Sequence, residues 1–83
     1  MIAEIAANIE VLAQFGRGGL RPRLFVWERR RHTISRVTAA WSEREGAHQR
    51  HYFAVQTDGA NLYELCFCTR SLTWSLVRIH SEG

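Results

Sequence analysis

The sequence predicts a mainly β (α+β) domain: an N-terminal helix, then a five-stranded antiparallel meander that forms a curved sheet or small open barrel. Two alternating apolar runs in residues 52–67 flank Asp58-Gly59, a pattern typical of a β-hairpin. Further short apolar runs are separated by turn residues, and residues 2–15 place apolar side chains at helical spacing. A chain of 83 residues can form one domain with a modest core.

Residues 1–15 are predicted to form an amphipathic helix. Their larger aliphatic side chains recur at spacings of three, four and three, and the set is Ile2, Ile5, Ile9 and Leu12. A helix this short is marginal alone, so its apolar stripe should dock on the sheet or pair two chains as a homo-oligomer. Gly16 begins a predicted flexible linker, residues 16–22, that ends at Pro22.

Residues 23–80 are predicted to form the β domain. The expected strands are residues 24–29, 33–41, 50–57, 62–68 and 74–79. On the second of these, Ile34 is an even-numbered residue whereas Val37 and Trp41 are odd-numbered, so a regular strand would place them on opposite faces. This change between even and odd positions predicts a bulge near residues 35–36, and a bulge would curve the sheet.

The register of the central hairpin follows from parity. A turn with Gly59, Ala60 and Asn61 at its tip keeps the apolar faces of both strands together. The predicted pairs are Phe53 with Phe67, Val55 with Leu65, and Thr57 with Tyr63.

The next hairpin should pair Glu64 with Arg78, Leu65 with Val77, and Tyr63 with Ile79. The opposite face of the sheet then carries many apolar side chains, which indicates an interface. Together with the helix stripe, the candidate apolar interface is Ile2, Ile5, Ile9, Leu12, Trp74 and Leu76.

The composition limits the class of protein. Apolar residues make up 46% and charged residues 23%, which excludes wholesale disorder, and no apolar run could cross a bilayer. Glu4 and Glu10 stand where a secretory signal would carry positive charge, so we expect a cytoplasmic protein with no membrane partner. The two cysteines should be free thiols in such a reducing compartment.

No catalytic, metal or cofactor site is predicted. Cys66-x-Cys68 and four histidines suggest zinc, but the predicted register points both cysteines to one face and His51 to the other. The sequence lacks the G-x-S-x-G and H-E-x-x-H motifs, and Glu43 and Glu45 lie in a segment expected to be a solvated loop. We therefore expect a protein that is not an enzyme.

Two functions remain open, a protein-interaction module and a nucleic-acid-binding module. The net charge is +3, and all eleven basic residues are arginine, which suits phosphate recognition. Single-strand binders combine arginine with aromatic faces. The candidate contact residues for nucleic acid or a protein partner are Arg21, Arg23, Trp27, Arg29, Arg30, Arg31 and Trp41.

Residues 22–79 resemble a family of small bacterial domains of unknown function, found alone or near the C-terminus of Y-family translesion DNA polymerase-like proteins. The matching pieces are Phe25-x-Trp27, Ile34-x-x-Val37 leading to Trp41, Tyr52-Phe53-x-Val55-x-Thr57-x-Gly59, Tyr63-Glu64-Leu65 and Trp74-x-Leu76-x-Arg78-Ile79. The chain departs from the family at Glu28-Arg29-Arg30-Arg31, where a glycine is expected, and at Cys66-Phe67-Cys68, where a more polar strand end is expected. The resemblance implies a DNA-repair setting and no catalytic residues.

Overall fold

The computed structural model describes residues 1–81, and within this range all regular secondary structure is β-strand. Its strands are β1 (Ile2–Gly16), β2 (Gly19–Trp27), β3 (Arg30–Thr33), β4 (Arg36–Glu45), β5 (His48–Gln56), β6 (Leu62–Cys68) and β7 (Thr73–His80). The predicted small domain with an antiparallel sheet is confirmed. The predicted fold class is wrong, because seven strands replace the five strands and the helix. No helix in residues 1–81 is long and apolar enough to cross a membrane.

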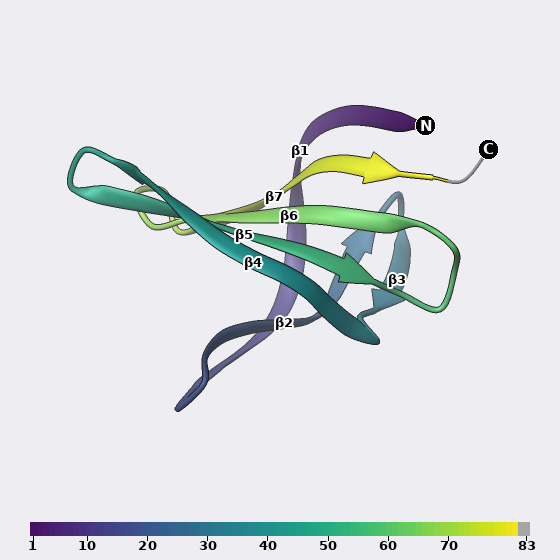
Figure 1. Cartoon of the computed structure of the whole chain (residues 1–83), viewed down its shortest axis with the longest axis horizontal. Helices are drawn as coiled ribbons and strands as arrows, with labels where there is room; N and C mark the ends of the chain where they lie inside the picture. Colours follow the sequence, from purple (N-terminus) through teal and green to yellow (C-terminus); the bar gives the residue numbers. More distant parts are fainter. Residues whose placement is uncertain (82–83) are drawn as a thin grey trace.

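The strands form one antiparallel sheet in the order β3-β2-β1-β7-β6-β5-β4. Two meanders, β1 to β3 and β4 to β7, are joined because the first half of β1 pairs with β7 and its second half pairs with β2. Figure 1 shows β1 running across the molecule between these two neighbours. Bulges between Glu4 and Ala7 and between Leu12 and Ala13 interrupt the two registers of β1. Such bulges increase the local bend, so the two halves of the sheet can face each other.

The predicted N-terminal helix is strand β1 instead. Alternate residues from Ile5 to Ala13 are partly buried, whereas the residues between them are exposed. This period of two belongs to a strand with one face toward the core. The expected linker, residues 16–22, forms the turn and first part of the β1–β2 hairpin, in which Gly16 pairs with Gly19. Gly19 has a φ of 89°, a value that glycine adopts without strain.

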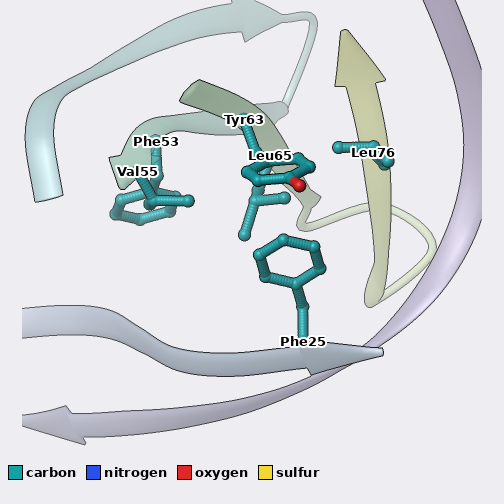
Figure 2. Packing of buried hydrophobic residues seen from close by; sticks show 6 residues of the cluster. All are labelled: Phe25, Phe53, Val55, Tyr63, Leu65 and Leu76. Carbon is teal, nitrogen blue, oxygen red and sulfur yellow. The ribbon is translucent and has the colours of Figure 1, made fainter. Parts of the chain in front are cut away.

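The core lies between the two halves of the bent sheet. Phe25 of β2 is fully buried and points toward the inward side chains of β5, β6 and β7, as Figure 2 shows. Its ring meets that of Tyr63 edge-on at 5.1 Å between centroids. The buried hydrophobic cluster is Phe25, Phe53, Val55, Tyr63, Leu65 and Leu76. This cluster holds the β2–β3 half over the β5–β7 half.

The β5–β6 hairpin has the predicted faces but not the predicted pairs. Phe53 pairs with Leu65 and Val55 with Tyr63, two residues away from the predicted register. The loop therefore covers residues 57–61, and Gly59 does not have a positive φ there. A shift by two residues leaves every side chain on its original face, so the apolar pattern permits both registers.

The β6–β7 hairpin follows the predicted register at one end. The predicted pairs of Tyr63 with Ile79 and Glu64 with Arg78 are confirmed. A bulge follows, and Leu65 pairs with Leu76 instead of Val77. Leu76 is consequently fully buried in the core rather than on the outer face.

The predicted strand 33–41 is interrupted, because residues 34–35 separate β3 from β4. The Ile34 amide donates to the Arg23 carbonyl on β2, and the Ser35 amide donates to the Gln56 carbonyl on β5. The chain thus passes from one edge of the sheet to the other at this point. A bulge lies between Val37 and Ala39 of β4, a few residues beyond the predicted position.

Candidate functional site: the seam cleft

Two strand edges without a neighbour face each other across the open side of the sheet. In the described part of the chain, β4 pairs only with β5, and all ten of its residues are exposed. The first part of β2 pairs only with β1, because β3 reaches only residues 24–27 of β2. Pro22 lies in this unpaired part, where a residue without an N–H group is tolerated. An open seam therefore runs between β2 and β4.

We call the groove along this seam the seam cleft. Its two parts have volumes of about 460 and 700 Å³ and share Leu20, Ala40 and Phe53 as lining residues. Leu20 comes from β2, Ala40 from β4, and Phe53 lies opposite Ala40 on β5. Because the parts share these residues, they adjoin each other along the seam between the two halves of the sheet.

One end of the seam cleft is basic. Arg21 and Arg23 from β2 and Arg36 from the start of β4 line this end, and no acidic residue of the described chain is among its lining residues. The Arg21 guanidinium lies over the β1–β2 turn, where a Cβ added to Gly18 would be 3.1 Å from Nη2 of Arg21. Gly18 therefore provides the space that Arg21 occupies.

The other end of the seam cleft is largely apolar. Phe15, at the end of β1, is 83% exposed and lines this end together with Trp41, which is 40% exposed. Trp41 stacks on Tyr52 with 5.4 Å between ring centroids and 6° between planes. The stack fixes the orientation of the Trp41 ring, and Tyr52 covers one face of that ring.

The ion pairs of residues 1–81 leave the basic end without a paired carboxylate. Arg50 pairs with Glu45 at 2.8 Å, and Arg78 pairs with Glu4 and Glu64. Arg50 lowers the pKa of the Glu45 carboxyl through a hydrogen bond and its charge. Seven of the eleven arginines lie in residues 16–36, where Glu28 is the single acidic residue. Positive charge is thus concentrated on the β2–β3 half and the start of β4.

The candidate contact residues occupy separate places. Arg21, Arg23 and Trp41 line the seam cleft. Trp27 packs against the core, whereas Arg29 lies in the β2–β3 turn. Arg30 pairs with Trp27, and Arg31 lies on β3 beside Val26. The structure does not assemble the arginines of the turn and the two tryptophans into one groove.

The candidate apolar interface is also divided. Ile5, Ile9 and Trp74 pack against the core, and Leu76 is part of it. Ile2 and Leu12 are 60% and 65% exposed, at different positions along β1. Four of the six residues therefore stabilise the fold of this chain, and no continuous stripe joins the other two.

No group of three or more potential metal-ligating side chains occurs among residues 1–81. Both cysteines are free, and they differ in environment. Burial raises the pKa of the Cys66 thiol, whereas hydrogen bonds from Ser71 and from the Arg70 backbone lower the pKa of the Cys68 thiol. Neither cysteine is among the lining residues of the seam cleft.

Sequence reasoning missed Phe15, Leu20, Ala40 and Arg36 as lining residues of the cleft. Phe15 could have been found, because the odd residues from Ile5 onward are apolar up to this position. The others come together only when residues 34–35 join the two edges of the sheet. Comparisons with protein-family models, with curated proteins and with solved structures gave no match to this chain.

Proposed function

We propose that this chain is a non-catalytic protein-interaction module that binds an extended segment of a partner protein in the seam cleft, along β4. The observation that carries the proposal is the position of β4: its unpaired edge borders a groove of the size of a small binding site. An unpaired edge presents backbone N–H and C=O groups, and an extended peptide satisfies both by adding a strand.

A protein segment fits this groove better than a nucleic acid. The backbone of β4 offers donors and acceptors, whereas phosphodiesters supply only acceptors. β2 is the weaker of the two edges, because Pro22 has no N–H to donate. Of the two tryptophans predicted as stacking surfaces, Trp27 packs against the core instead of lining the cleft, and Tyr52 covers one face of Trp41.

The resemblance to domains near translesion polymerase-like proteins suggests the biological context of the proposal. The partner would then be a protein of bacterial, cytoplasmic DNA repair, and this chain would act as an accessory module without catalysis.

Tryptophan substitutions at two neighbouring alanines, one in the cleft and one outside it, test the proposal. Ala40 lines the cleft and pairs with Phe53, whereas the neighbouring Ala39 points to the opposite face of β4. Peptides from a random display library are selected on the immobilised chain, and their binding is measured to the wild type, Ala40→Trp and Ala39→Trp. Hydrogen exchange then maps the amides that the bound peptides protect.

We expect micromolar binders that protect amides of β4, lose affinity for Ala40→Trp by about tenfold or more, and bind Ala39→Trp like the wild type. Peptides that protect a different strand, or that bind both variants equally, would overturn the proposal. A selection that yields no binder at all would overturn it as well.

A further inference from the structure

We infer that the segment bound in the seam cleft is acidic, with carboxylates facing Arg21, Arg23 and Arg36. This inference rests on the proposed function and specifies the chemistry of the partner. It is carried by the charge at one end of the cleft, where three arginines line the groove and no acidic residue of the described chain does.

The three arginines reach the cleft from two sides. Arg21 and Arg23 flank Pro22 on the unpaired part of β2, and Arg36 begins β4 on the other side. A segment lying along β4 would therefore pass between basic side chains at this end. Guanidinium groups match carboxylates with paired N–H donors, and such charge-assisted bonds are stronger than bonds between neutral groups.

The cleft also implies an order of side chains along the segment. The basic end contains all three arginines, and the other end contains Phe15, Trp41 and Phe67. Acidic residues should therefore occupy one half of the bound segment and apolar residues the other half. Alternate residues of a strand point to the same side, so acids should recur at every second position.

A carboxylate-bearing peptide is favoured over a single-stranded nucleic acid for two reasons. A peptide can pair with the β4 backbone at the same time as its acidic side chains meet the arginines, whereas the phosphodiester groups of a nucleic acid only accept hydrogen bonds and cannot donate to the β4 carbonyls. The other arginine cluster of the chain, Arg29 to Arg31, lies in the β2–β3 turn and on β3 rather than in the cleft lining.

Fluorescence anisotropy with defined probes tests the inference on the full chain. The first probe is a labelled peptide of about ten residues, similar in length to β4, with alternating glutamates in one half and valine and tyrosine in the other. The second replaces each glutamate by glutamine. The third is a labelled oligothymidylate. Titrations at about 50 and 300 mM salt separate the electrostatic part of binding.

Two triple variants with equal loss of charge provide the control. The cleft variant is Arg21→Gln, Arg23→Gln, Arg36→Gln, and the turn variant is Arg29→Gln, Arg30→Gln, Arg31→Gln. All six side chains are exposed, so both variants should keep the fold, which circular dichroism verifies.

We expect the glutamate peptide to bind about tenfold tighter than the glutamine peptide at the lower salt. The cleft variant should remove that preference, and the turn variant should change it by less than about twofold. Equal binding of the two peptides, or an equal effect of the two variants, would overturn the inference. Tighter binding of the oligothymidylate, abolished in the cleft variant, would assign the cleft to nucleic acid instead.

The outcomes also separate this inference from the proposed function. If the glutamine peptide binds as well as the glutamate peptide and Ala40→Trp blocks both, the cleft binds extended segments but without the acidic preference. If neither peptide binds and the display selection also fails, the proposed function itself is wrong.

Discussion

Arg78 on β7 pairs with Glu64 on β6, with 3.0 Å between Nη1 and Oε1, although Glu64 is only 6% exposed. The pair lies on the face of the sheet away from the core, and Nε of Arg78 also meets Glu4 of β1 at 3.3 Å. The Glu64 hydrogen bond and charge raise the pKa of Arg78. One arginine thus connects three strands, including the two that join the meanders.

Replacing Arg78 by Met should destabilise the protein by about 1–3 kcal/mol. The change leaves the nearly buried Glu64 carboxylate with His80 as its remaining side-chain partner in the described chain. Urea denaturation measures the loss, and Arg17→Met at the exposed β1–β2 turn is the control. An unfolding free energy equal to that of the control would show that water replaces the Arg78 hydrogen bonds without cost.

The predicted faces of β5 and β6 were correct because a face depends only on local alternation. Phe53, Val55 and Leu65 share an inward parity that any register with an even shift preserves. The pairing of strands was not predictable in the same way. It depends on the length of the loop at residues 57–61, and the alternation contains no information about that length.

The helix prediction failed because residues 2–15 carry two periodicities. Ile2, Ile5, Ile9 and Leu12 fit a helix, but the partly buried odd residues from Ile5 to Ala13 fit a strand. Pairing with both β2 and β7 decides between them, and β7 is distant in the sequence. The cleft was unpredictable for the same reason, since Arg21 and Arg36 meet only after the sheet bends.

Ile9 and Leu12 provide a direct test of strand β1. A helix would place both side chains on one face, whereas the strand packs Ile9 against the core and leaves Leu12 exposed. Ile9→Ala should therefore destabilise the protein by about 1–4 kcal/mol, and Leu12→Ala by less than about 0.5 kcal/mol. Equal losses in urea denaturation would favour the helix.

A glycine in the β2–β3 turn should stabilise the protein. Glu28 and Arg29 have φ values of 52° and 65°, which cost energy for residues with a Cβ. Two consecutive positive φ values in a two-residue hairpin are typical of a type I′ turn, for which Asn-Gly is preferred. Glu28→Asn combined with Arg29→Gly should raise the unfolding free energy by about 0.5–1 kcal/mol.

Thermal and urea denaturation at constant salt measure this gain. Gly19→Ala is the complementary change, because it places a Cβ at a φ of 89°, and it should destabilise. Gly16→Ala has open space around the new Cβ and no positive φ, so it is the neutral control. A double variant that is less stable than the wild type would contradict the type I′ assignment of the β2–β3 turn.

Cys66 and Cys68 should give opposite pH dependences to stability. Burial raises the pKa of Cys66 in the folded chain, so its contribution is complete below the pKa of the unfolded thiol and is lost as the pH rises through the folded pKa. Hydrogen bonds from Ser71 and the Arg70 backbone lower the pKa of Cys68. Its contribution is present above the unfolded pKa and is lost as the pH falls through the folded pKa.

The two single variants therefore change the alkaline pH profile in opposite directions. Between about pH 8 and 10, the unfolding free energy of Cys66→Ala should decrease less than that of the wild type, and that of Cys68→Ala should decrease more. Urea denaturation under reducing conditions gives both profiles. Burial also raises the pKa of Tyr52, so some decrease should remain in Cys66→Ala. Identical slopes for the two variants would mean that neither thiol is linked to folding in this range.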